Sequence, residues 1–162
     1  YLYQELGILT AAFMLGLALG GWFIGQKISN VYVDISALFK TELAVALCCL
    51  LTPVILGLLS SPATELVIQY LARLMLPLLN CATGFFVGLE FPLAGKLLMR
   101  NRDRVGGVAG ALYASDLVGA CVGSLLSSVW LIPLFGVLRA CIVTAGLNFA
   151  SLIFLFIVIR SR

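Results

Sequence analysis

Two carboxylates, Glu90 and Asp116, lie inside stretches of the sequence that are otherwise apolar. Glu90 precedes Arg100 by ten residues and Asp116 follows Gly106 by ten residues. At the rise of a helical residue, both then lie about 15 Å from the polar turn between them. Two carboxylates at equal depth on adjacent antiparallel helices could share a proton or hold a cation between them. We therefore take them as the centre of a candidate proton or cation site.

A structural role would explain the same two residues. Pro92 removes a backbone hydrogen bond and disfavours helical geometry at the residue before it, so we expect a local break that Glu90 caps. Asp116 would then hydrogen-bond to a polar side chain of the bundle. Three candidates for this partner complete the site, namely Tyr113, Asn80 and Asn148. The sequence leaves both roles open.

The sequence offers no ligand set for a zinc site or a bis-histidine haem. It contains no histidine, and its five cysteines stand in apolar runs without a CxxC spacing. A buried cysteine most often acts as a small apolar side chain. We expect no metal, no cofactor, no disulfide framework and no nucleic-acid partner.

The composition indicates an integral membrane protein. Hydrophobic residues make up 62% of the 162 residues and charged residues 10%. Soluble domains have about 45–50% and about 25%. We therefore expect an all-α integral membrane protein in which residues 1–162 form a single membrane domain, without a separate soluble domain of ordinary size.

Five stretches are long and apolar enough to cross a bilayer, residues 6–26, 42–59, 76–99, 107–132 and 138–159. Between the second and third, residues 63–74 alternate apolar and polar side chains at helical spacing, which predicts a short interfacial helix. A single helix from residue 63 to residue 100 would be about 57 Å long, so we divide it near Leu76. The expected fold is a bundle of about five transmembrane helices plus one interfacial helix.

Small residues recur at every fourth position on three of these helices, which lets a second helix approach at backbone distance. The expected helix-packing residues are Gly16 and Gly20, Gly84 and Gly88, and Ser115, Gly119 and Gly123. The fourth helix carries the longest such run, which we name the small-residue face: Ala111, Ser115, Gly119, Gly123 and Ser127. Its partner would be another helix of this chain or of a neighbouring membrane protein.

Positive charge is divided unequally between the two ends of the expected helices. Eight Lys and Arg residues fall on one side and two, Arg73 and Arg139, on the other. Cytoplasmic loops are enriched in positive charge, so we assign the first side to the cytoplasm. We expect a protein of the plasma membrane, in bacteria the inner membrane, with Tyr1 outside and Arg162 inside. Without a signal peptide, this orientation requires a missing upstream helix or unaided crossing of the N-terminus.

Several motifs resemble those of one family. The runs AAFMLGLALGGWFIGQKI, GLEFPLAGKLL and GALYASDLVGACVGSLLSSVWLIPLFGVLRA, together with Glu42, are similar to the membrane domain of spermidine synthase-like multi-pass proteins. The resemblance covers most of the chain. It implies a membrane region similar to transporters of the major facilitator type, commonly fused to a cytosolic aminopropyltransferase domain and preceded by a further helix.

The catalytic part of that family is not expected in this chain. An aminopropyltransferase requires a soluble α/β domain with a Gly-rich turn after a strand, and no stretch offers that context. We expect no enzyme but a multi-pass subunit or partial membrane domain, packed against lipid and partner helices in a larger membrane assembly. The alternative is a transporter-like domain that binds or moves a polyamine or a proton through Glu90 and Asp116. Five helices are few for a transporter, because such folds pair two repeats around a central site.

Overall fold

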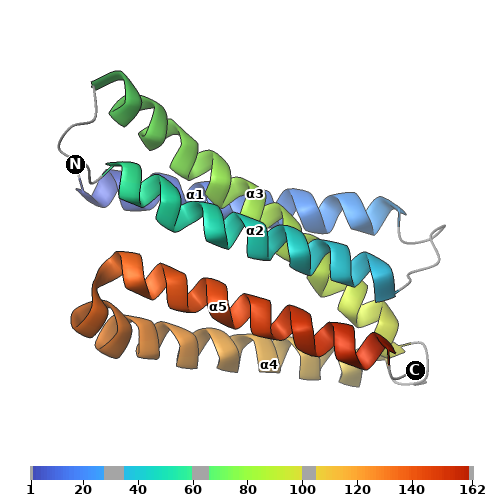
Figure 1. Cartoon of the computed structure of the whole chain (residues 1–162). Coiled ribbons are helices and arrows are strands. Elements are labelled where there is room, and N and C mark those ends of the chain that lie inside the picture. Colours follow the sequence, from blue (N-terminus) through green and yellow to red (C-terminus); the bar gives the residue numbers. More distant parts are fainter. Residues whose placement is uncertain (1, 28–34, 60–65, 100–104, 161–162) are drawn as a thin grey trace.

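The computed structural model describes residues 2–27, 35–59, 66–99 and 105–160, and these ranges are built from helices (Figure 1). The helices are α1 (Leu2–Lys27), α2 (Ile35–Leu59), α3 (Leu66–Met99), α4 (Val105–Leu125), the π-helical segment η1 (Leu126–Leu131) and α5 (Ile132–Arg160). Helix α2 begins at Ile35 instead of near Glu42, which places Glu42 about 10 Å inside the helix.

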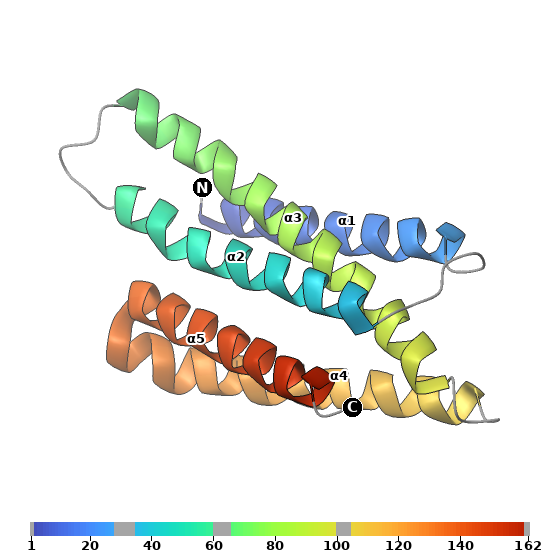
Figure 2. The same cartoon turned by 45° about the vertical axis from the view of Figure 1, so that its right-hand side comes forward.

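Four helical stretches are long and apolar enough to cross a membrane, one fewer than the five we expected: Tyr3–Gln26, Ser36–Gly57, Arg73–Leu98 and Gly106–Ile157. The difference arises because the expected helices 107–132 and 138–159 join into one run of 52 residues. Gly136 divides this run, since its backbone is non-helical at φ 79° and ψ 165°, a conformation that glycine adopts readily. Figures 1 and 2 show α5 running back alongside α4 after this glycine.

The expected interfacial helix at 63–74 is not a separate element. Residues 63–65 lie outside the described part, and from Leu66 onward α3 is one helix of 34 residues that passes through Pro77 and Pro92. The division near Leu76 and the break beside Pro92 were therefore wrong. Bilayer helices tolerate proline because neighbouring helices and local adjustments satisfy the freed backbone groups. Figure 1 shows α3 crossing α1 and α2 obliquely, and a tilt of this kind accommodates a long helix.

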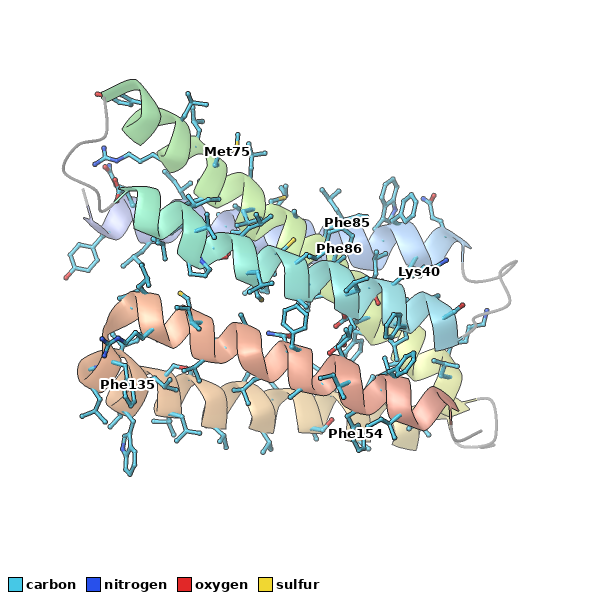
Figure 3. All side chains as sticks on the ribbon, viewed as in Figure 1. Lys40, Met75, Phe85, Phe86, Phe135 and Phe154 are labelled. Atoms are coloured by element: carbon cyan, nitrogen blue, oxygen red, sulfur yellow. The ribbon has the colours of Figure 1, made fainter. Side chains whose placement is uncertain are left out.

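Helices α1 and α3 pack against each other through glycines. Gly16 and Gly20 of α1 lie against the backbone carbonyls of Cys81 and Phe85, and a β-carbon at either glycine would overlap those oxygens. Reciprocally, Gly84 and Gly88 of α3 lie against the backbone carbonyls of Phe13 and Leu17 of α1. The side chain of Phe85, beside Phe86 in Figure 3, packs its ring 6.0 Å from that of Phe23. Residue numbers rise together in these contacts, so the two helices run parallel.

Helices α2 and α5 form an antiparallel pair. Leu138 of α5 lies 3.8 Å from the position that a β-carbon on Gly57 of α2 would occupy. Further along the pair, the Asn148 amide donates a hydrogen bond to Cys49 Sγ at 3.6 Å. At the far end of the pair, the rings of Phe39 and Phe156 lie 6.1 Å apart. Three contacts thus fix one register along the whole pair. Ala46 and Ala145, at 0% and 1% exposure, are the most buried residues of their helices in the described part.

Helix α4 packs far less than the others. Among its described residues only Val108 is buried and only Leu112 is half-buried. Of the described helices, only α3 and the adjoining η1 bring Cα atoms within 8 Å of those of α4. The groove between α4 and the rest of the bundle contains the site described next.

Candidate functional site

A groove of about 510 Å³ lies where α2, α3 and α4 face one another. We name it the acidic groove, and its lining is Leu38, Glu42, Val87, Glu90, Phe91, Ala94, Leu112, Ser115, Asp116, Gly119 and Ala120. Each of the three helices contributes one carboxylate and at least one apolar or small side chain. The groove therefore combines negative charge with an apolar wall.

Helical periodicity directs these carboxylates into the groove. On α2, Glu42 follows Leu38 by one turn, and on α3 Glu90 lies one turn before Ala94 and one residue before Phe91. On α4 the lining residues recur at spacings of three and four, so one face of that helix points into the groove. Asp116 lies on this face beside two members of the small-residue face.

The three carboxylates have no partners in the protein as described. Glu90 is half-buried, and its Oε1 atom is fully buried without a hydrogen bond. Glu42 is also half-buried, whereas Asp116 is exposed. Among the described residues, no hydrogen bond or ion pair reaches any of the three side chains. A carboxylate inside a membrane span would be costly unless it faced protein, water or an opposite charge.

The structure brings together two of the five residues that we predicted for the site. Glu90 and Asp116 line the same groove, on α3 and α4. Tyr113 is 58% exposed and lies outside the lining. Asn80 donates instead to the Leu9 carbonyl at 3.1 Å, where it joins α3 to α1.

Asn148 also serves packing between helices. Its amide donates to the Thr144 carbonyl at 3.1 Å and to Cys49 Sγ at 3.6 Å. None of the three expected partners therefore bonds to Asp116. Because α3 continues through Pro92, Glu90 caps no break either. The structural role that we had weighed lacks both of its expected contacts.

Sequence reasoning left Glu42 out of the candidate site. We placed it at the start of a helix, two residues after Lys40, where a carboxylate would be at the membrane boundary. The structure begins α2 at Ile35 and extends it past Lys40, which Figure 3 labels on the same helix. The spacing of Leu38 and Glu42 was the available signal, because it continues the helical pattern upstream.

The carboxylates line the groove without converging on one point. Within the described ranges, no group of three or more Asp, Glu, Cys or His side chains is arranged to hold a metal ion. A positive group that matched all three would therefore have to extend along the groove.

A second, smaller cavity lies between α1 and α3. It measures about 230 Å³ and is lined by Glu5, Ile8, Leu9, Arg73, Leu76 and Pro77. Here a basic side chain accompanies the acidic one. Glu5 therefore offers a matched control for the carboxylates of the acidic groove.

Two curated proteins of Streptomyces coelicolor are similar to part of this chain. Polyamine aminopropyltransferase 2 is 36% identical over 77 residues, which are 47% of this chain and 14% of that protein. Polyamine aminopropyltransferase 1 is 36% identical over 70 residues, which are 43% of this chain and 13% of that protein. No family model matches the chain, and no solved structure matches it.

The chain is thus partly homologous to polyamine aminopropyltransferases. This partial similarity agrees with the resemblance to spermidine synthase-like proteins, and four helical stretches are long and apolar enough to cross a membrane. Because the match covers about a seventh of each relative, these 162 residues do not contain a full aminopropyltransferase.

Proposed function

We propose that this chain is a non-catalytic membrane domain, or part of one, of a spermidine synthase-like protein, and that it packs against further helices in a larger membrane assembly. The partial similarity to two polyamine aminopropyltransferases supports the relationship. The four apolar helical stretches support the membrane location. In this proposal the domain lies in the plasma membrane with the N-terminus outside and the C-terminus in the cytoplasm.

The open side of α4 carries the proposal of an assembly. A β-carbon added to Gly119 or Gly123 would meet nothing within 4 Å, whereas one added to Gly20 or Gly84 would overlap the backbone of the facing helix. Small residues at four-residue spacing favour close helix packing. The small-residue face has the composition of a helix interface, and this chain leaves its glycines uncovered.

Purification of the native protein in a mild detergent tests the assembly. We expect the chain to migrate with further membrane subunits, or with the remainder of a longer polypeptide. Gly119→Leu should reduce this association, and Leu126→Ala should leave it unchanged. A stable single species that contains only these helices would contradict the proposal.

The acidic groove favours a second candidate function, a transporter-like domain that binds a cation or a proton through Glu90 and Asp116. Three carboxylates and an apolar wall suit an extended organic cation, and the volume of about 510 Å³ is that of a small-molecule site. The names of the two relatives make a polyamine the first ligand to test.

Thermal unfolding in the presence of spermidine tests this candidate. If the groove binds the polyamine, spermidine should raise the melting temperature of the native protein, because a ligand that binds only the folded state stabilises it. Glu90→Gln and Asp116→Asn should each weaken the effect, and Glu5→Gln should not. Equal melting temperatures with and without spermidine would exclude binding of that polyamine.

A further inference from the structure

We propose that the acidic groove receives a transmembrane helix of the assembly that presents a lysine or arginine to Glu90 and Asp116. This inference rests on the proposed function, since it identifies one of the surfaces through which the domain packs and the chemistry of the helix bound there. It follows from the position, the lining and the charge of the groove.

The groove lies between helices that are long and apolar enough to cross a membrane. Glu42, Glu90 and Asp116 belong to three separate candidate membrane spans, Ser36–Gly57, Arg73–Leu98 and Gly106–Ile157. Lipid chains cannot solvate carboxylates, so lipid is a poor occupant of this groove. The occupant must be apolar along most of its length, because the other lining residues are apolar or small.

The α4 side of the groove is built for a helix. Leu112, Ser115, Asp116, Gly119 and Ala120 form one stripe along α4, and Ser115 and Gly119 belong to the small-residue face. Short side chains at this spacing allow another helix axis to approach closely. The same stripe holds Asp116, so a helix docked there would meet the carboxylate directly.

Charge complementarity sets the chemistry of that helix. The groove carries three carboxylates, and no basic side chain is among its lining residues. Glu90 lines the groove and is half-buried, and burial of a carboxylate without an opposite charge is costly. A lysine or arginine from a partner helix would supply both the hydrogen bonds and the opposite charge.

A model helix can test this inference directly. The full chain is reconstituted in phosphatidylcholine vesicles with a synthetic helix of about 22 leucine and alanine residues that has one central lysine. A matched peptide has leucine in place of the lysine. Energy transfer between a donor on the peptide and an acceptor at the C-terminus of the protein measures association.

We expect the lysine peptide to associate about fivefold more tightly than the leucine peptide, in line with the strength of polar contacts between membrane helices. The combined variant Glu90→Gln and Asp116→Asn should abolish this preference, and Glu5→Gln should retain it. Both variants conserve side-chain size, and circular dichroism checks that they remain folded.

Three outcomes would overturn the inference. The first is equal association of the two peptides, and the second is a preference for the lysine peptide that survives loss of both carboxylates. The third is stabilisation by spermidine that depends on the carboxylates, in a protein that shows no preference for the lysine peptide. The last would make the groove a small-cation site. If partner chains co-purify with the protein but the protein shows no preference for the lysine peptide, this inference is wrong and the proposed assembly still stands. A lysine preference in a chain that purifies alone would support the groove and contradict the native assembly.

Discussion

Gly20 of α1 lies directly against the backbone carbonyl of Phe85 in α3, so that the space for a β-carbon at residue 20 is filled by the facing backbone. Gly84 of α3 meets the carbonyl of Phe13 in the same way. Each helix thus offers glycines where the other presents carbonyls. This reciprocal contact joins the first and third helices over two turns, and it differs from the open glycines of α4.

Gly20→Leu should separate α1 from α3. No rotamer of the new side chain avoids the Phe85 carbonyl, because the clash occurs at the β-carbon itself. We expect the free energy of unfolding to fall by about 3 kcal/mol, the upper end of overpacking costs. Reversible unfolding in mixed detergent micelles measures it. Gly25→Leu is the control, because a β-carbon at this position of the same helix would meet nothing within 4 Å. Equal losses of unfolding free energy for the two variants would refute the contact between Gly20 and Phe85.

Gly119→Leu should affect assembly and not folding. Nothing in the described structure lies within 4 Å of a β-carbon at residue 119, so unfolding of the isolated chain should change by about 0.5 kcal/mol or less. The same variant should lose the associated subunits in native purification, because a leucine prevents close approach to the small-residue face. A fall in chain stability as large as that of Gly20→Leu would show that α4 packs inside the chain.

Glu90 and Asp116 should behave as a coupled pair if one group occupies the groove between them. Their combined neutralisation, Glu90→Gln with Asp116→Asn, should differ from the sum of the single effects by about 0.5 kcal/mol or more. The measurement is thermal or denaturant stability of the four proteins of the double-mutant cycle. Glu90→Gln with Glu5→Gln is the control cycle and should be additive. Additivity in both cycles would place Glu90 and Asp116 in separate sites.

The register of α2 against α5 can be tested with a disulfide. Asn148 lies within hydrogen-bonding distance of Cys49 Sγ, so Asn148→Cys should form a bond with Cys49 under mild oxidation. Mass spectrometry of the digested protein identifies the linked peptides. Asn80→Cys, whose native side chain contacts Leu9 on the other side of the bundle, should leave Cys49 free. Absence of a linkage between Cys49 and residue 148 would contradict this register of the antiparallel pair.

The orientation predicts which turns react from outside the cell. A cysteine at Ser61 should react with an impermeant thiol reagent in intact cells, and a cysteine at Asn101 should react only after lysis. Both positions lie outside the described residues, so this prediction depends on the charge asymmetry of the sequence. Labelling in the opposite pattern would invert the orientation.

Several features of the fold follow from the sequence because they depend on local composition. Apolar runs of sufficient length predict helices at membrane depth, since each exposed backbone group must be bonded within its own segment. The same reasoning failed near Leu76, where the length of a single helix was taken to require a division, and at Pro92, where proline was read as a break. Helix α3 continues through both places. The low helix preference of proline is measured in water. In a helix bundle, the neighbouring helices compensate for the backbone hydrogen bond that proline removes.

The sequence by itself predicted long apolar helices, their approximate places, and two carboxylates, Glu90 and Asp116, that require an explanation. Only the tertiary structure decided that Glu42 shares their groove, that Asn80 and Asn148 join other helices, and that the glycines of α1 and α3 meet while those of α4 stay open. Periodicity reports which residues share a face of one helix. The face that each neighbour covers depends on helix tilt and crossing, which arise from packing across the whole bundle.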